Sequence, residues 1–315
     1  MAKKNILITG AGGFIGRNLA EFLGAKKDLY KVFAARHSDL ELLDEKAVKT
    51  FIRAKKIDLV LHCSNTGGSR KTGYDSGATD VVLKNLKMFF NLARALPASA
   101  RMINMGSGAE YGVRRRKIKE TAFDAVVPAD AYGFSKYVVS KYIEKADNIL
   151  CLRIFGLYGK YEDYRFKFIS NAIVKNLLGM PLVINQNVRF DYLYIADFLE
   201  IVERFIKRKP AFKHINITPT KSVDLLTAAA IINGIAAKKS PVKVLNPGLN
   251  AEYSADNSRL LQEVPGFRFW TYEEGIAELY KYYAANLDSL DLSSVRKDPY
   301  LAKCRTSAKG RPGSR

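Results

Sequence analysis

The sequence predicts an α/β protein with a Rossmann-type, doubly wound parallel sheet and a smaller C-terminal α/β lobe. Two observations support this fold class. Short apolar segments alternate with amphipathic ones along residues 5–154, which is typical of strands and helices that alternate around a parallel sheet. Beyond residue 155 the alternation loosens, and the later segments predict a lobe over the carboxyl edge of the sheet.

A glycine-rich turn follows the first predicted strand, at 5–8, and precedes a predicted helix at 17–23. It reads Gly10-Ala11-Gly12-Gly13-Phe14-Ile15-Gly16, with three glycines spaced three apart. Glycine lets the backbone turn sharply and approach a ligand closely, and the helix N-terminus suits a pyrophosphate. We therefore expect Gly10, Gly13, Phe14, Ile15 and Gly16 to bind a dinucleotide. The alternative is a glycine-rich turn without a ligand.

The second strand, predicted at 30–35, ends at Arg36, where a dinucleotide fold meets the adenosine ribose. An acidic residue at this point would hydrogen-bond the 2′-hydroxyl of NAD, whereas the guanidinium of Arg36 can pair with a 2′-phosphate. The sequence therefore favours NADP(H), with NAD as the second possibility. In the alternative interpretation Arg36 only faces solvent.

The remaining elements follow from apolar periodicity. Further strands are expected at 59–61, 101–105, 149–154, 182–184, 192–195 and 215–217, and helices at 44–55, 79–95, 131–145, 166–178, 196–207, 222–235 and 270–285. A polar, glycine-rich loop at 66–77 is a candidate substrate flap. We divide the chain into a dinucleotide-binding domain at 1–155, a mainly substrate-binding lobe at 156–288 that partly returns to the first domain, and a flexible basic tail at 289–315.

Ser107, Tyr132 and Lys136 are the candidate catalytic residues. Tyr132 and Lys136 are four apart on a predicted helix, so they share one face. A nearby ammonium lowers the pKa of a tyrosine from about 10 toward working pH, so the phenol can exchange a proton with a sugar oxygen while hydride moves at the attached carbon. Ser107 ends the preceding strand and is expected to polarise the same oxygen. The alternative is an ordinary pair of surface side chains.

The chain has 315 residues and a formal net charge of +20. Part of this excess lies in Arg114-Arg115-Arg116-Lys117 and in residues 295–315. Such charge attracts anions, nucleic acid or acidic membrane, although charge runs are commonly solvated. No apolar run reaches about 18 residues, so no membrane span is expected. The first strand begins close to Met1, which leaves no room for a signal peptide.

Cysteine and histidine usage favours a reducing compartment. Cys63, Cys151 and Cys304 are far apart and form neither a metal-binding spacing nor a disulfide framework. The three histidines are likewise scattered. We therefore expect a cytoplasmic protein without a bound metal.

Together these motifs resemble the extended short-chain dehydrogenase/reductase family, and more narrowly its NAD-dependent epimerase/dehydratase group, which acts on nucleotide sugars. The resemblance covers roughly residues 4–205. It is carried by Thr9-Gly10-x-x-Gly13-x-x-Gly16, Ser107, Tyr132-x-x-x-Lys136, the run 106–112, Glu120, Pro128 and the runs 152–159 and 191–197. It implies a homodimer formed through the helices near 79–95 and 130–146.

Within this group, residues 36–48 are similar to the GDP-fucose synthase and dTDP-4-keto-rhamnose reductase branch, which reduces a 4-keto sugar with NADPH. The resemblance implies that Glu41 and Leu42 lie near the adenine, Ser64 lies beside the cofactor and Phe155 lies near the nicotinamide. It also implies that Lys136 holds the nicotinamide ribose. Substrate contacts are expected from Ser107 and Tyr132, with Arg189 as the candidate cation for the sugar diphosphate.

The reaction is narrowed by one departure from the family pattern. Dehydratases of this group carry an Asp-Glu pair after the Ser position, whereas this chain has Gly108 and Ala109 there, which disfavours water elimination. The sequence therefore predicts an NADP(H)-dependent reductase of a 4-keto-6-deoxy nucleotide sugar. Two alternatives stay open: a nucleotide-sugar 4-epimerase with tightly bound NAD, and a catalytically silent nucleic-acid-binding relative. Neither a membrane nor a nucleic-acid partner is expected.

Overall fold

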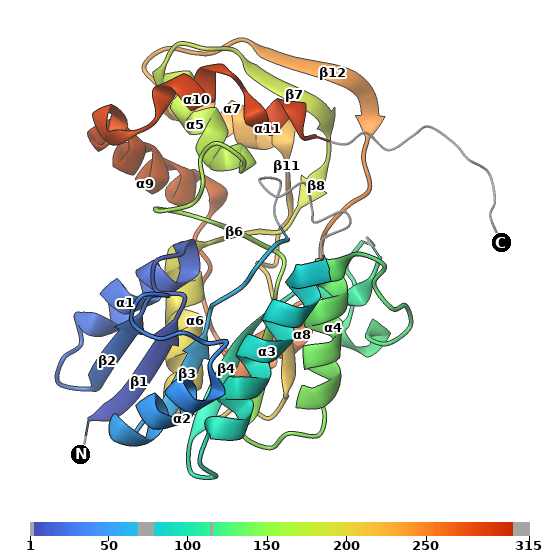
Figure 1. Ribbon diagram of the computed structural model, residues 1–315. Helices are drawn as coiled ribbons and strands as arrows, with labels where there is room; N and C mark the ends of the chain where they lie inside the picture. The colour runs from blue at the N-terminus through green and yellow to red at the C-terminus, as the bar shows by residue number, and fades with distance from the viewer. Residues whose placement is uncertain (1–2, 69–78, 114–115, 305–315) are drawn as a thin grey trace.

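The computed structural model describes residues 3–68, 79–113 and 116–304, and it has a lower lobe built on a parallel sheet and a smaller upper lobe (Figure 1). The sheet has six strands in the order β2-β1-β3-β4-β5-β10. Because β1 lies between β2 and β3, the strand order reverses at β1. In doubly wound sheets a ligand crevice opens where the order reverses. It lies at the carboxyl ends of two adjacent strands, which here are β1 and β3.

Helices cover both faces of the sheet (Figure 1). The strands are β1 (Lys4–Thr9), β2 (Tyr30–Ala35), β3 (Leu59–His62), β4 (Arg101–Ser107), β5 (Ile149–Ile154) and β10 (His214–Ile217). One face is covered by α1 (Phe14–Gly24), α6 (Ile195–Lys207) and α8 (Ser258–Glu263), and the other by α2 (Glu45–Ala54), α3 (Thr79–Ala95) and α4 (Ala131–Ile143).

The period of two along β1 explains why the sheet has two apolar faces. Ile6 and Ile8 are buried in the core beneath α1 and α6, whereas Leu7, between them, is buried in the core beneath α2 and α3. Successive side chains of a strand point to opposite faces, so a strand buried on both sides must be apolar throughout. This pattern is why the sequence predicts the sheet well.

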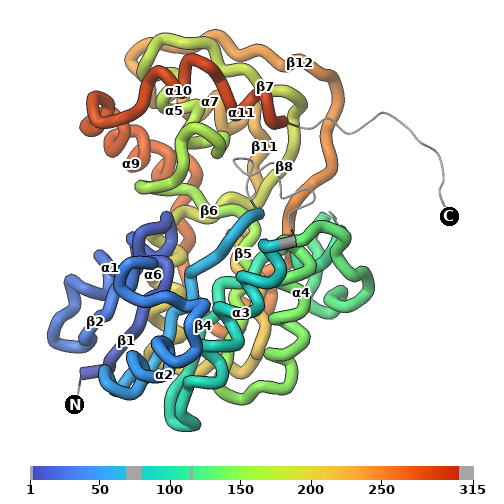
Figure 2. Tube along the Cα trace, viewed as in Figure 1, coloured from blue at the N-terminus to red at the C-terminus, as the bar shows by residue number. Residues whose placement is uncertain are grey.

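The upper lobe has a core of its own, formed by helices and two-stranded sheets (Figure 2). Its helices are α5 (Phe168–Leu177), α7 (Leu225–Ile235), α9 (Tyr272–Ala285), α10 (Leu292–Arg296) and α11 (Pro299–Ala302). Its strand pairs are β7 (Leu182–Asn187) with β12 (Val242–Leu249), and β8 (Arg189–Phe190) with β11 (Val223–Asp224). The pair β6 (Gly156–Tyr158) with β9 (Tyr192–Tyr194) joins the two lobes, because Leu157 and Leu193 pack in the lower core and Tyr158 packs in the upper one. Short 3-10 helices occupy Gly108–Tyr111, Glu120–Ala122 and Leu287–Ser289.

The predicted fold class is confirmed, and two details differ from the sequence-based expectation. The first part of the expected flexible tail, 289–304, instead forms α10 and α11, because Val295 and Tyr300 are buried in the upper core. The strand β12 was not predicted, because seven of its eight residues are exposed and leave no burial pattern. The chain also returns to the lower lobe after residue 155, through α6, β10 and α8.

Some expectations fall on residues outside the described ranges. These are most of the candidate flap at 66–77, Arg114 and Arg115 of the basic run, and residues 305–315 of the tail. Within the described ranges, none of the helices is long and apolar enough to span a membrane.

Candidate active site

The glycine-rich turn forms a cradle made of backbone. Gly10 has a φ of +65°, a conformation that favours glycine, and its carbonyl accepts a hydrogen bond of 3.0 Å from the N–H of Gly13. A Cβ atom on Gly10 would lie 2.8 Å from the backbone nitrogen of Ser64, and a Cβ on Gly16 would overlap the carbonyl oxygen of Gly10. The N-cap of α1 is Gly13, without a side-chain cap and without an acidic residue in the first turn. These features fit a dinucleotide pyrophosphate at the helix N-terminus.

Thr9 and His62 fix the other side of this cradle. The Thr9 hydroxyl accepts hydrogen bonds from the N–H groups of Cys63 (3.2 Å) and Ser64 (3.3 Å), and lies 2.9 Å from Nδ1 of His62. A hydroxyl has two lone pairs and one proton. Because the two N–H groups occupy both lone pairs, Thr9 donates its proton to Nδ1 of His62. His62 is therefore neutral and carries its proton on Nε2. Burial, aided by Lys136, lowers the pKa of His62 to about 3.

Lys136 reaches from α4 to the end of β4. Its Nζ donates a 2.9 Å hydrogen bond to the carbonyl of Met105, two residues before Ser107. The same Nζ lies 5.7 Å from the centroid of the Tyr132 ring, so the pair expected on one helix face is formed. Lys136 is buried, and desolvation lowers its pKa, although the charge of Glu110 opposes that change.

Tyr132 packs against the loop that follows β3. Gly68, with a φ of +74°, lies so close to the phenol ring that a Cβ atom there would approach ring carbons to 2.6 Å. The ring of Tyr132 is half-buried. Both Gly68 and Tyr132 line the cavity.

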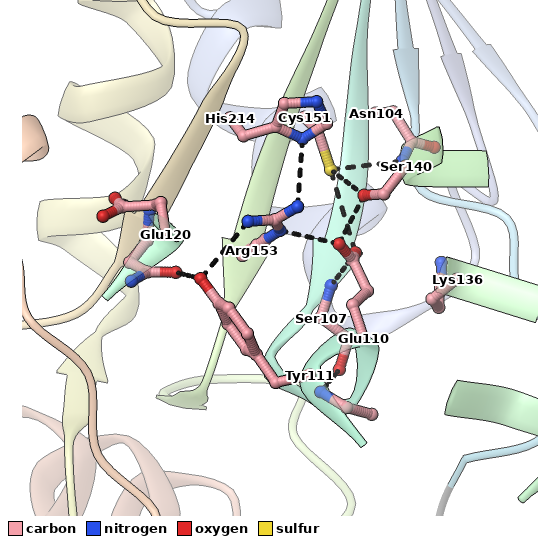
Figure 3. Close-up of polar contacts among 12 residues, drawn as sticks. Asn104, Ser107, Glu110, Tyr111, Glu120, Lys136, Ser140, Cys151, Arg153 and His214 are labelled. Atoms are coloured by element: carbon pink, nitrogen blue, oxygen red, sulfur yellow. Dashed lines mark hydrogen bonds and ion pairs between the residues drawn. The ribbon is translucent and has the colours of Figure 1, made fainter. Parts of the chain in front are cut away.

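Ser107 begins the 3-10 helix Gly108–Tyr111, and Figure 3 shows the polar groups behind it. Its backbone N–H donates to the Glu110 carboxylate at 2.8 Å, and its hydroxyl accepts from the N–H of Ala109 at 3.2 Å. This is a capping box, in which a Ser cap and a Glu three residues later satisfy each other's backbone groups. The Ser-x-x-Glu spacing in the sequence is the signal that could have identified Glu110.

A cavity of about 1450 Å³ brings the candidate residues together. Residues from the glycine turn, both catalytic segments and the upper lobe line it, namely Gly10, Gly13, Phe14, Ile15, Gly16, Ser107, Tyr132, Lys136, Phe155, Phe166, Lys167, Phe190, Tyr192, Tyr253 and Tyr300 among others. The predicted trio therefore shares one cavity with most of the predicted dinucleotide cradle. The aromatic lining from the upper lobe was not predicted, because its residues come from separate loops and short strands.

Five predicted contact residues lie outside the cavity lining. Arg36 is exposed after β2, and Glu41 accepts from the N–H of Leu43 at 2.7 Å. Leu42 is buried beneath the α3 side of the sheet, while Ser64 contacts the glycine turn through its backbone. Arg189 is exposed at the start of β8, so it does not line the cavity as expected for the diphosphate-binding cation.

Lys167 is a cation in the cavity lining that the sequence analysis did not single out. It is the N-cap of α5, and among the described lining residues Lys136 and Lys167 are the two cationic ones. It lies within the helix predicted at 166–178 and belongs to no motif, so the sequence offered no signal for it.

The thiols near the site are poor nucleophiles. Desolvation raises the pKa of Cys63 and of Cys151 to about 12. Among the described residues, no group of three or more His, Cys, Asp or Glu side chains could hold a metal ion.

The geometry defines a dinucleotide-dependent α/β enzyme of the short-chain dehydrogenase/reductase type. The family model described as "NAD dependent epimerase/dehydratase family" matches residues 6–218. The chain belongs to this family, and it is an NAD(P)-dependent enzyme.

Similar proteins agree on the fold and differ in reaction. GDP-L-colitose synthase of Yersinia pseudotuberculosis is 24% identical over 62% of this chain and 70% of its own length. The structure of dTDP-4-dehydrorhamnose reductase from Bacillus anthracis in complex with NADP has a TM-score of 0.76 at 19% identity, covering 90% of this chain and 99% of that one. UDP-glucuronic acid 4-epimerase from Bacillus cereus, in complex with UDP-glucuronic acid and NAD, has a TM-score of 0.73 at 21% identity, with 89% and 99% covered.

Proposed function

We propose that this protein is an NADP(H)-dependent reductase of a nucleotide-diphosphate sugar, acting on a 4-keto-6-deoxy sugar. The observation that carries the proposal is the convergence of Ser107, Tyr132 and Lys136 on the cavity that begins at the glycine turn. At about 1450 Å³, the cavity exceeds the roughly 300–1,000 Å³ of a site for one small ligand. It has room for a dinucleotide beside a nucleotide sugar, and the names of two similar proteins support that substrate class.

The catalytic residues have separate roles in this proposal. The nicotinamide, when bound, supplies a hydride to the keto carbon. Tyr132 donates its phenolic proton to the oxygen of that carbon, and Ser107 orients the same oxygen by a hydrogen bond. Lys136, fixed by the Met105 carbonyl, holds a positive charge beside the phenol, and such a charge favours the phenolate that remains after proton transfer.

Water elimination is disfavoured by what surrounds Ser107. Gly108 lies against Tyr253 and Phe155, where a Cβ atom would meet the Tyr253 hydroxyl and the Phe155 ring, so there is no room for an acidic side chain. Among the described residues that line the cavity, Asp130 and Glu162 are the acidic ones, and both are engaged elsewhere. The first caps α4, and the second accepts a hydrogen bond from Ser170.

A 4-epimerase is the second candidate, because the same three residues can oxidise and then reduce one sugar carbon. The likeness to a UDP-glucuronic acid 4-epimerase structure with NAD supports it. The two functions differ in how they hold the cofactor. A reductase exchanges NADPH each turnover, whereas an epimerase retains NAD through the purification. A catalytically silent nucleic-acid-binding role is not proposed, since all three catalytic residue types line the cavity.

Arg36 supports the choice of NADPH. Its guanidinium is exposed one residue beyond β2, while the neighbouring Asp39 carboxylate accepts the Arg36 backbone N–H at 2.8 Å. The acid is thus turned toward the backbone, and the cation is left available for a 2′-phosphate. Replacing Arg36 with Ala is expected to weaken NADPH binding about tenfold and leave NADH binding unchanged, as titration of nicotinamide fluorescence would measure.

The substrate diphosphate is assigned to the start of α5. Lys167 and the first N–H groups of a helix without acidic residues in its first turn provide positive charge at the cavity wall. Phe190, Tyr192 and Tyr253 form an aromatic cluster beside it, with ring centroids 5.1 Å and 6.3 Å apart for the pairs that include Phe190. We assign the nucleoside base to this cluster, because bases stack on aromatic rings.

A substrate screen tests the proposed function. Purified protein would be mixed with NADPH or NADH and with 4-keto-6-deoxy sugars carried on GDP, dTDP, UDP or CDP, and absorbance loss of the reduced nicotinamide would be followed. The proposal expects turnover with NADPH and one of these substrates. Turnover of none of them, with NAD released only on denaturation, would instead establish the epimerase.

We further propose a homodimer that packs α3 and α4 against their copies. These two helices lie side by side on one face of the sheet (Figure 1). Leu83 on α3 is 65% exposed and Tyr142 on α4 is 43% exposed, which is unusual for large apolar side chains on adjacent helices. Light scattering would measure the mass in solution, and a monomer would overturn this assignment.

A further inference from the structure

The carboxylate of Glu110 lies completely buried behind the catalytic residues and forms the centre of a polar network (Figure 3). One oxygen, Oε1, accepts the backbone N–H of Ser107 at 2.8 Å. The other, Oε2, accepts from Nε of Arg153 at 2.8 Å and from the hydroxyl of Ser140. The thiol of Cys151 lies 3.8 Å from Oε1, so the donors to this carboxylate come from the end of β4, from α4 and from β5.

The backbone makes room for this carboxylate. A Cβ atom on Gly106 would collide with Oε1 of Glu110 and would approach Sγ of Cys151 to 2.6 Å. The backbone at the carboxyl end of β4 therefore leaves space for the Glu110 carboxylate. The arrangement is more specific than a surface ion pair, because a methyl group at Gly106 would displace the carboxylate.

The network joins the two segments that carry the catalytic groups. Tyr132, Lys136 and Ser140 are spaced by four along α4, so they share one face of that helix. Lys136 is tied to β4 through the Met105 carbonyl, and Ser140 is tied to the residues after β4 through Glu110. The two ties lie one helical turn apart, so together they fix both the position and the rotation of α4 relative to Ser107.

We propose that Glu110 is a positioning residue for the reaction: its carboxylate fastens Ser107 to the helix that carries Tyr132 and Lys136. This inference rests on the proposed roles of those three residues. An ordinary buried ion pair would not have this function. The pair with Arg153 alone would stabilise the fold, but it would not fix the position of Ser107.

The charge of Glu110 also acts on Lys136. The other groups that face the ammonium are His62 from β3, Cys63 after it, Cys151 on β5 and the Tyr132 ring on α4. His62 is neutral, and both thiols keep their protons at neutral pH. Glu110 is therefore the acid that favours the charged form of Lys136 against desolvation.

Three single variants separate positioning from stability. Glu110→Gln replaces one carboxylate oxygen by an NH₂ group, which cannot accept a hydrogen bond. In one orientation of the amide the bonds from Arg153 and Ser140 are lost, and in the other the bond from the Ser107 N–H is lost. Ser140→Ala removes the tie between Glu110 and α4, together with the 3.5 Å contact of the Ser140 hydroxyl with Sγ of Cys151, and leaves the carboxylate in place. Glu120→Gln is the matched control: this second buried acid accepts the N–H of Asn216 at 2.9 Å and lies 3.9 Å from Arg259, away from the trio.

Steady-state kinetics and thermal unfolding would be measured for each. Glu110→Gln and Ser140→Ala are expected to lower kcat roughly 10- to 100-fold with KM for the cofactor within about twofold, because catalytic groups misplaced by an ångström lose this much. Glu120→Gln is expected to lose stability but keep kcat. Equal kcat values for Glu110→Gln and Glu120→Gln would overturn the proposal.

The pH profile gives a readout that a purely structural role would not move. Without the Glu110 charge, Lys136 loses the anion that favours its charged form, so the alkaline limb of kcat is expected to shift to lower pH in Glu110→Gln and to stay in place in Ser140→Ala. An unshifted limb in Glu110→Gln contradicts the charge effect.

Two further measurements keep the inference separable from folding and from the proposed function. If Glu110→Gln does not fold because Arg153 is left unpaired, Glu110→Gln/Arg153→Met removes both charges and is tested in its place. If the wild-type protein turns over no nucleotide sugar, the proposed function fails, and crystal structures still decide the positioning role. A Ser107 hydroxyl displaced from Tyr132 in the variant supports it, and an unmoved hydroxyl overturns it.

Discussion

The two halves of the cavity are built in different ways. The half proposed to bind the dinucleotide is made of backbone: Gly10 at a positive φ, Gly16 against the Gly10 carbonyl, and the uncapped start of α1. The half proposed to bind the substrate is made of side chains, with Phe190, Tyr192 and Tyr253 contributed by separate segments of the upper lobe. Backbone geometry tolerates almost no substitution, whereas an aromatic wall can change residue by residue and so can change the ligand.

The largest expected effect tests the point where the two halves meet. Tyr132→Phe removes the proton that the substrate oxygen takes but keeps the ring against Gly68. We expect kcat to fall roughly 10²- to 10⁴-fold, the usual contribution of general acid catalysis, with cofactor affinity nearly unchanged. Stopped-flow measurement of NADPH oxidation and calorimetric titration of NADPH would check both. Retained turnover would remove Tyr132 from the mechanism.

The next effect concerns the backbone half. Gly10→Ala forces a side chain into a left-handed conformation and against the Ser64 backbone, so we expect dinucleotide binding roughly 10- to 100-fold weaker. Gly12→Ala is the control, because a Cβ atom there meets nothing within 4 Å. Fluorescence titration would compare the two variants, and equal affinities would show that the turn does not hold the dinucleotide as described.

A smaller effect is expected on the side-chain half. Lys167→Met should raise KM for the nucleotide sugar about tenfold, because a charged hydrogen bond to the diphosphate is lost, and should leave cofactor binding intact. Arg189→Met is the matched control, since Arg189 lies outside the cavity lining. If the Arg189 variant is the one that loses substrate affinity, the diphosphate lies elsewhere than at the start of α5.

Sequence patterns and structure agree best where burial and backbone constraints impose a period. The apolar run Ile6, Leu7 and Ile8, whose side chains point to alternate faces of β1, predicted the sheet. The spacing of the glycines and the Tyr132–Lys136 interval predicted the residues that meet in the cavity. The exposed strand β12 and the helices α10 and α11 were missed because neither has a strong period. Lys167 entered the site only through the tertiary arrangement, which no local pattern encodes.

The last expected effect is on stability rather than on activity, and it compares buried and exposed histidines. Burial lowers the pKa of His62 and of His214 to about 3. Below pH 6.5 the unfolded chain therefore binds protons that the native protein does not, so stability falls as pH falls from 6.5 toward 3, by at most about 1.4 kcal/mol per pH unit for each histidine.

Thermal unfolding across this pH window would measure that slope. His214→Phe, which keeps an aromatic ring beside Phe123, is expected to make the dependence shallower. His37→Gln, at a side chain that is 84% exposed, is expected to leave it unchanged. Identical slopes in all three proteins would show that His214 takes up its proton in the native state as readily as in the unfolded chain.

Isotope transfer tests the central claim most directly. The protein would be incubated with NADPH carrying deuterium on the transferred position and with a 4-keto-6-deoxy nucleotide sugar, and the product would be analysed by mass spectrometry and NMR. The account predicts one deuterium at carbon 4 of the sugar for each NADPH consumed. Unlabelled product formed without loss of NADPH would contradict reduction by an exchangeable cofactor.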